Sequence, residues 1–361
     1  MARSGVDTLP ISTRCQSNVN DTLHEFNSPP DGFLHCSALD LHRVLLGPSL
    51  LHWPGPGPTL FVSVLLHGNE DAGLRALQRL LQKYQGRPLP RAMSVFVGNV
   101  HSAASGVRHL PEQPDFNRIW AHSDAHVSPY HQMAAQVLHR MQRQPLFAVL
   151  DLHNNTGRNP LYSCVSSTEP VHRRLAALFS PIVVKVDGLR SLNEAFSALA
   201  PSICCECGEI GNETGVQRAF ELLESCLTLT PEALQGLDDS QLQVLEAYAE
   251  IHVPSSVTIG FDETQAGVDL CLSPDIDLLN FLPLPKGQVL ARTGQHTTEA
   301  PLVARNVNDG QVLDLFEREG QSMQLKEATM AAMLTPSIAA IRQTCLGYLM
   351  RPVQPDTLPH A

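Results

Sequence analysis

Two histidines and one glutamate stand where apolar segments of the sequence end. The apolar run 60–66 stops at the tetrapeptide HGNE, which contains His67 and Glu70, and the apolar run 146–154 ends with His153 in DLHN. Zinc in hydrolases is typically held by three nitrogen or oxygen side chains, and two histidines with one carboxylate are a known set. A His-x-x-Glu pair alone often arises by chance. Matching ligand types at two strand ends predict a metal site.

The elements around these residues alternate in type. Runs rich in Val, Ile, Leu and Phe predict buried strands at 59–67, 93–100, 146–154, 182–188 and 202–209. Apolar residues spaced three and four apart predict helices at 74–84, 129–142 and 215–227. We therefore expect an α/β fold, with a mostly parallel, mixed sheet and helices on both faces. Ligands of such sheets collect at the carboxyl ends of the strands, where these polar clusters stand.

The pattern of apolar runs and turn-forming residues changes between residues 235 and 250. We expect the segment 242–263 to form a connecting helix that runs into a strand. Short apolar runs punctuated by Gly, Pro, Asn and Asp follow and predict a small β-rich domain. The expected division is a poorly ordered N-terminal extension (1–30), a catalytic domain (31–240) and a β-rich C-terminal domain (241–361), whose tail is poorly ordered or lies on the surface.

Composition narrows the class of protein. The chain has 361 residues, 43% of them apolar and 17% charged, as in ordinary globular proteins. Its net charge of −11 argues against nucleic acid or an anionic membrane as a partner. No apolar run approaches the ~20 residues of a membrane span, and the N-terminal segment lacks the apolar core of a secretory signal. Nine cysteines without disulfide-like spacing favour reduced thiols. We expect a cytoplasmic protein, which could form a homo-oligomer.

Four short motifs follow one another along the chain. They are HGNE (67–70), DFNRIW (115–120), DLHNNT (151–156) and ECG (206–208). In this order they resemble the zinc carboxypeptidase-type fold, and most closely its succinylglutamate desuccinylase and aspartoacylase branch. The segment 278–291 also resembles the beginning of that family's C-terminal β-rich domain, so the resemblance covers most of the chain. The motifs are specific for the superfamily but not for a substrate.

The resemblance implies the metal site residue by residue. His67, Glu70 and His153 would be the ligands of one Zn²⁺ per chain. Asp115 would accept a hydrogen bond from a ligand histidine, and outer carboxylates of this kind set the tautomer of the histidine and raise its basicity.

The resemblance also implies how an anionic small-molecule substrate is held. Asn117 and Arg118 would bind its carboxylate, which a planar guanidinium can grip through two parallel hydrogen bonds. Phe116 stands where the family usually has leucine. Arg108 could be a second anion contact, because the aspartoacylase branch has an additional arginine upstream of its Asp-Leu-Asn-Arg segment. The match is loose, since the segment around Arg108 is longer than in that branch and is interrupted by proline. Asn154 could line the pocket.

Glu206 matches the Glu-x-Gly pattern and would be the general base and acid, whereas Glu209 does not match it. In a strand, Cys204 and Glu206 face one side, and Cys205 and Cys207 face the other. If Glu206 faces the metal, the second pair of thiols points into packing, where buried cysteines are common. This disfavours a cysteine nucleophile or a thiolate–zinc site.

The leading hypothesis is a zinc hydrolase that cleaves the amide bond of an N-acyl amino acid. A metallocarboxypeptidase acting on peptide C-termini is the alternative within the same class. A binding protein that kept the fold and lost catalysis should lack a ligand or the base, and all four residues are present. A purely structural zinc protein would use a closed, cysteine-rich site, and the sequence has no Cys-x-x-Cys pair.

Overall fold

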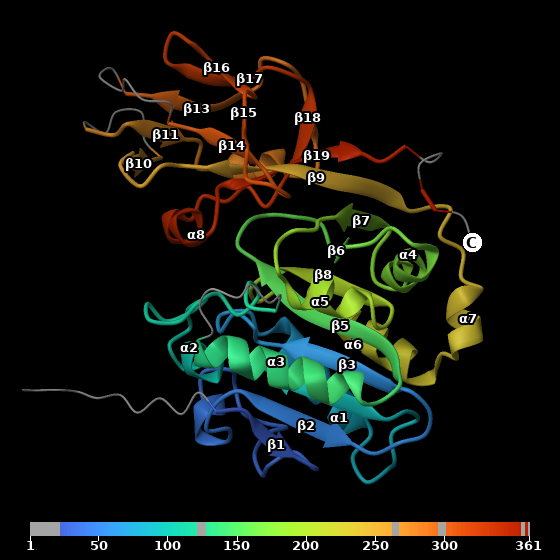
Figure 1. Cartoon of the computed structure of the whole chain (residues 1–361). Coiled ribbons are helices and arrows are strands. Elements are labelled where there is room, and N and C mark those ends of the chain that lie inside the picture. Colours follow the sequence, from blue (N-terminus) through green and yellow to red (C-terminus); the bar gives the residue numbers. More distant parts are fainter. Residues whose placement is uncertain (1–21, 121–127, 262–266, 295–300, 355–357, 360–361) are drawn as a thin grey trace, which may run out of the picture.

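One long mixed β-sheet runs through the molecule and contains strands from both parts of the chain (Figure 1). This computed structural model describes residues 22–120, 128–261, 267–294, 301–354 and 358–359. In spatial order the main path of the sheet is β1 (His24–Phe26), β2 (Ser49–Trp53), β4 (Met93–Val97), β3 (Thr59–Val64), β5 (Leu146–Asn155), β8 (Ser202–Glu209), β6 (Tyr162–Val165), β7 (Ile182–Lys185), β9 (Gln243–His252), β19 (Gly347–Pro352), β18 (Thr329–Ala332) and β12 (Pro283–Leu284). The hairpin of β14 (Val303–Asn306) and β15 (Val312–Leu313) joins it through β9.

Helices cover both faces of the first part of the sheet. One face packs against α1 (Ala72–Lys83), α4 (Pro170–Ala177) and α6 (Glu213–Thr228). The other packs against α3 (Pro129–Gln142) and α5 (Leu192–Ser197). Shorter helical elements are η1 (Leu41–Arg43), α2 (Val100–Ala104), α7 (Pro231–Gln235), η2 (Ile276–Leu279) and α8 (Ile338–Gln343). The expected α/β fold is confirmed.

Side-chain alternation in the central strands explains why both faces are buried. In β3, Leu60, Val62 and Val64 pack toward the α1 and α6 layer, whereas Phe61 packs toward the α3 and α5 layer. β3 is parallel to β4 and β5, and β5 is parallel to β8. The carboxyl ends of β3, β5 and β8 therefore lie together at one edge of the sheet, and that edge carries the predicted site.

The expected helix at the start of segment 242–263 is wrong. Residues 243–252 form β9, which pairs with β7 in parallel and with β19 and β14 in antiparallel orientation. Its burial follows a period of two, because Leu245, Ala247, Ala249 and Ile251 are buried while the residues between them are half-buried. Pairing on both sides stabilises the extended conformation of a segment rich in helix-forming residues.

Both ends of the chain are more ordered than expected where the structure describes them. Within the extension predicted at 1–30, residues 24–26 form β1 and pair in parallel with β2. Residues 1–21 lie outside the described residues. Arg351 and Pro352 belong to β19, so the start of the predicted tail is part of the sheet. Backbone pairing provides the order that composition alone did not reveal.

The region after residue 240 is rich in strands, as expected. Besides the strands that extend the large sheet, it forms a second sheet of five strands: β10 (Ile259–Gly260), β11 (Leu270–Leu272), β13 (Val289–Thr293), β17 (Ser322–Leu325) and β16 (Phe316–Glu319). The large sheet continues across residue 240 through the pairing of β7 with β9. The division into domains at 31–240 and 241–361 stays a prediction.

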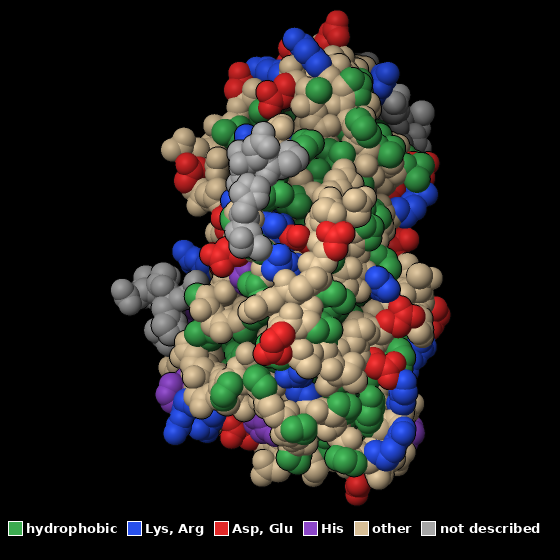
Figure 2. Space-filling view, turned by 90° about the vertical axis from the view of Figure 1, so that its right-hand side faces the viewer, with side chains coloured by type: hydrophobic (Ala, Val, Ile, Leu, Met, Phe, Trp, Pro, Cys, Tyr) green, Lys and Arg blue, Asp and Glu red, His purple; other side chains and the backbone are tan. Residues whose placement is uncertain are grey.

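Charges of both signs are interspersed over the face of the molecule drawn in Figure 2. The net negative charge is thus not gathered into one acidic region on that face. No helix formed by the described residues combines the length and apolar character needed to cross a bilayer.

The close packing of α6 on β8 predicts that a methyl group added at Gly215 destabilises the fold. A Cβ at Gly215, in the first turn of α6, would overlap the carbonyl oxygen of Cys207 in β8. We expect Gly215→Ala to lower the free energy of unfolding by about 1–3 kcal/mol, since backbone must move to make room. Gly236→Ala is the matched control, because its Cβ would have no neighbour closer than 3.6 Å. Equal urea midpoints for the two variants would contradict this packing.

Candidate active site

The turn after β3 places two of the predicted ligands. Leu65 is buried and has a φ of 55°, a left-handed conformation that is costly for a branched residue. It ends the strand and redirects the chain into the HGNE turn. A Cβ at Gly68 would overlap the backbone of Ser102 and Ala103 in α2, so only glycine fits between them. The turn is held tightly, and its conformation aims His67 and Glu70 at the end of β5.

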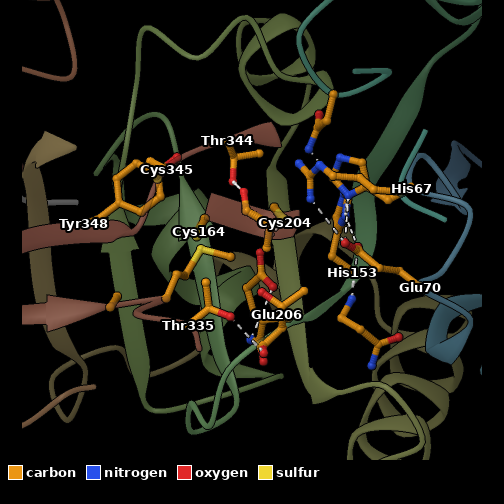
Figure 3. A pocket seen from close by; sticks show the side chains of 18 of the residues that line it. His67, Glu70, His153, Cys164, Cys204, Glu206, Thr335, Thr344, Cys345 and Tyr348 are labelled. Carbon is orange, nitrogen blue, oxygen red and sulfur yellow. Dashed lines mark hydrogen bonds and ion pairs between the residues drawn. The ribbon is translucent and has the colours of Figure 1, made fainter. Parts of the chain in front are cut away.

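His67, Glu70 and His153 converge on one point (Figure 3). The two Nδ1 atoms of the histidines are 3.2 Å apart. The Glu70 carboxylate lies 2.9 Å from Nδ1 of His67 through one oxygen and 2.8 Å from Nδ1 of His153 through the other. The three side chains are only 3–4% exposed. The structure therefore brings together all three side chains that the sequence predicted as metal ligands.

The far nitrogen of each histidine meets a carboxylate. Nε2 of His67 lies 2.9 Å from Asp115, and Nε2 of His153 lies 2.9 Å from Asp151. Nδ2 of Asn117 is a further 3.3 Å neighbour of Nε2 of His153. Contacts of this kind hold the Nε2 side of each ring, so that Nδ1 is left free to bind a metal. Asp115 was predicted in this position, whereas Asp151 was not.

The electrostatics of the group favour a bound cation. Burial opposes ionisation of Glu70 and Asp115, yet neighbouring imidazoles, and Arg108 beside Asp115, bring the pKa of each carboxyl below its usual value. Burial likewise opposes charge on His153, but Asp151 and Glu70 raise its pKa well above the usual value. The same field that stabilises a proton on His153 would stabilise a metal ion in its place.

Zinc fits this donor set. Two imidazole nitrogens and a carboxylate are the ligands of many hydrolytic zinc sites. The ligand atoms of a tetrahedral ion with bonds of about 2.0–2.1 Å lie about 3.3 Å apart, close to the separations of 2.8–3.2 Å found here. A second group, Asp151, His153 and Cys204, also has its donor atoms within 4.8 Å of one another. It shares His153, so the two groups are alternatives for one ion.

Glu206 lies beside this group on the neighbouring strand. It is the register partner of His153 in the pairing of β8 with β5, and it lines the same cavity. Burial raises its pKa to about 7, and the nearby Glu70 acts in the same direction against the lowering effect of His153. Gly208 has a φ of +77°, which explains the glycine of the Glu-x-Gly pattern at the point where the strand ends.

The thiols of β8 lie as strand alternation predicted. Cys204 lines the cavity with Glu206, and its Sγ is 3.8 Å from a Glu206 oxygen. Cys205 and Cys207 are fully buried in the core beneath α6. Burial raises the pKa of both of these thiols, so they are packed as apolar residues.

The predicted substrate-binding residues differ in how far their side chains are already paired. Asn117, Arg118 and Arg108 all line the cavity. Arg108 donates to Asp115 from Nε at 3.1 Å and from Nη2 at 2.8 Å, and it also lies 3.5 Å from Glu70. Arg118 donates from Nη1 to the carbonyl oxygen of Asn117 at 2.9 Å. Arg118 is thus the better placed of the two arginines to bind a further anion.

Asn154 has a clear structural role. Its Oδ1 accepts from the Ala72 amide at the start of α1 (3.0 Å), and its Nδ2 donates to the carbonyl oxygen of Gly208 (2.9 Å). Its own amide donates to Glu70 at 3.2 Å. Asn154 therefore ties the ends of β5 and β8 to the HGNE turn. A contact with substrate stays a prediction.

Two residues at the site were missed from the sequence, Asp151 and Asn155. Nδ2 of Asn155 donates to Glu206 at 3.4 Å, and its buried Oδ1 has no partner among the described residues. Strand periodicity carried the signal for both, because Asp151 and Asn155 stand two residues before and after His153 and so share its side of β5.

Comparisons with known proteins agree with this geometry. Residues 56–225 match the family model described as the succinylglutamate desuccinylase/aspartoacylase catalytic domain. Comparison with curated proteins gives no match. Among solved structures, succinylglutamate desuccinylase from Vibrio parahaemolyticus aligns with a TM-score of 0.56 at 13% identity, over 84% of this chain and 86% of that one.

Two further structures show the same fold. The succinylglutamate desuccinylase from Chromobacterium violaceum has a TM-score of 0.51 at 17% identity, over 84% of this chain and 86% of that one. A mutant of murine aminoacylase 3 has a TM-score of 0.50 at 17% identity, over 82% and 96%. Residues 56–225 of this chain thus match a succinylglutamate desuccinylase/aspartoacylase catalytic domain, and the chain shares the fold of solved structures of that kind.

Proposed function

We propose that this protein is a zinc-dependent hydrolase that cleaves the amide bond of a small N-acyl amino acid. The observation that carries the proposal is the convergence of His67, Glu70 and His153 beside a buried carboxylate, Glu206, in one cavity. The match of residues 56–225 to a succinylglutamate desuccinylase/aspartoacylase catalytic domain supports the same reaction type.

The chain's own residues would divide the work as follows. His67, Glu70 and His153 would hold Zn²⁺, which supplies a Lewis acid that polarises the substrate carbonyl and lowers the pKa of water. Glu206 would accept a proton from the water that attacks the carbonyl carbon. As the C–N bond breaks, Glu206 would deliver that proton to the leaving nitrogen. A carboxyl with a pKa near neutrality is suited to both transfers.

The substrate's carboxylate would be held by Arg118 and Asn117. Both line the cavity, and the amide of Asn117 is positioned by the Leu192 amide, which donates to its Oδ1 at 3.0 Å. A charge-assisted contact with Arg118 would orient the amide bond toward the metal and Glu206. The resulting product pair is a carboxylic acid and a free amino acid.

The cavity supports a small substrate. Its volume is about 300 Å³, at the lower end of the range for small-molecule sites. Residues of β9, β18 and β19 complete its wall, so the C-terminal strands limit what can enter. This favours an N-acyl amino acid over a long peptide.

The direct test combines metal analysis with a substrate panel. We expect about one zinc per chain, and hydrolysis of a member of a panel of N-succinyl, N-acetyl and N-formyl amino acids and short peptides. Glu206→Gln should retain zinc and lower kcat by about 10²–10⁴-fold, because it removes the proton carrier and leaves the ligands in place. Glu209→Gln is the matched control, since Glu209 is exposed on the same strand. Full activity of Glu206→Gln would contradict the role of Glu206, and absence of bound zinc would contradict the ligand set.

Glu206 also predicts a pH dependence of stability in the metal-free protein. Its pKa is about 7 in the folded state against a usual value of 4.5, so its favourable contribution is complete below pH about 4.5 and is lost as the pH rises through 7. Glu206→Gln should therefore become progressively more stable than the wild type between pH 5 and pH 8, by on the order of 3 kcal/mol. Urea unfolding at several pH values measures this difference. A difference that does not change with pH would show that the carboxyl titrates normally.

A further inference from the structure

The cavity continues beyond the metal ligands into a region of different chemistry. In Figure 3 the ligands lie on one side, Tyr348 and Cys345 lie on the opposite side, and Glu206 lies between them. The far wall is formed by a cluster of apolar side chains on β6, β7, β9, β18 and β19, which we call the apolar wall: Tyr162, Val184, Ala247, Ala332 and Met350. Each of these five residues is buried.

Two arginines supply the positive charge at the cavity, and they differ in how their side chains are paired. Arg108 and Arg118 are the lysine or arginine side chains that line it among the described residues. Arg108 is already paired through two nitrogens with Asp115. One substrate carboxylate can therefore pair with Arg118. On the side of the apolar wall a second carboxylate would meet no further lysine or arginine among the described residues, because the polar side chains that line the cavity there, such as Thr335 and Thr344, are neutral.

A second carboxylate would be disfavoured at that wall for two reasons. It would lose its hydration without gaining a cation, and burial of an unpaired charge is costly. It would also lie in the same cavity as Glu206 and Glu70, whose charges repel it. An apolar group at the same position would instead be removed from water favourably.

We propose that the preferred substrate is an amide with a single carboxylate. This carboxylate binds Arg118, and an apolar group of the substrate packs against the apolar wall. This inference rests on the proposed hydrolase function and names its substrate class. The apolar group could be the side chain of the amino acid or the chain of the acyl group. Either group would make the same apolar contact with the wall. Substrates that differ in only one of the two groups show which of them makes it.

Near-isosteric pairs of substrates give a direct test. N-acetylleucine against N-acetylaspartate changes the amino acid side chain, and N-(4-methylpentanoyl)glycine against N-succinylglycine changes the acyl group. We expect kcat/KM of the zinc-loaded full chain to favour the apolar member of at least one pair by about 100-fold or more, because sites discriminate strongly against groups that they leave unpaired. The pair with the larger ratio identifies which group contacts the wall.

A variant that adds a cation tests the location. Val186 follows β7, lines the cavity and is only half-buried, so an arginine can be introduced there at small cost. Val186→Arg should reduce the ratio of kcat/KM for the apolar member to kcat/KM for the dicarboxylate at least tenfold. Val186→Gln introduces a polar side chain without charge and should leave most of this ratio unchanged. Ala332→Leu should lower kcat/KM for the preferred apolar substrate more than for N-acetylglycine, because the larger side chain fills the part of the cavity next to the apolar wall.

The outcomes separate this inference from the proposed function. Equal or better hydrolysis of both dicarboxylates would overturn the inference and leave the hydrolase function standing. An unchanged ratio in Val186→Arg, with the variant folded, would overturn the assignment of the wall. No hydrolysis of any member, N-acetylglycine included, by zinc-loaded protein would overturn both.

Discussion

Burial of like charges is the constraint on which the site depends. Glu70, Asp115 and Asp151 are carboxylates placed at or beneath the sheet edge around two histidines, His67 and His153. Carboxylates so far from water need compensating positive charge. Arg108 compensates Asp115, and a proton or a metal ion between the histidines would compensate the remainder. The arrangement is poorly explained as a way of stabilising the fold, and it is well explained as a way of holding a cation.

The fold satisfies this constraint by collecting side chains from parallel strands. The ends of β3, β5 and β8 lie side by side, so one residue or turn from each reaches the same point. The positive φ of Leu65 turns the chain directly after β3. The positive φ of Gly208 coincides with a shift of register in the pairing of β8 with β5. The C-terminal strands then complete the cavity on the side away from His67, Glu70 and His153. One continuous sheet thereby positions the proposed metal ligands, the proposed general base Glu206 and the apolar wall.

Much of this arrangement could be predicted from the sequence, where local patterns carry the information. Apolar runs gave the central strands, and alternation in the strand 202–209 correctly separated Cys204 and Glu206 from Cys205 and Cys207. The same alternation, applied to 146–155, would have favoured Asn155 over Asn154 as a residue facing Glu206. Asp151 was missed because the Asp-Leu-His motif was interpreted for its histidine alone.

The remaining features depend on contacts between distant segments. The strand 243–252 contains many helix-forming residues, and pairing with β7 and β19 overrides their intrinsic preference. The commitment of Arg108 to Asp115 depends on how a loop folds back over seven residues. The apolar wall combines side chains from five strands that are spread between residues 162 and 352 of the sequence. Local periodicity contains no information about such combinations.

The coordination of the bound metal tests the central claim most directly. X-ray absorption at the zinc edge of the purified protein measures the number and type of ligand atoms. If His67, Glu70 and His153 bind the ion, the first shell will contain only nitrogen and oxygen at about 2.0–2.2 Å, with two imidazoles. A sulfur at about 2.3 Å would show that Cys204 binds the ion with Asp151 and His153, and would contradict the site described here.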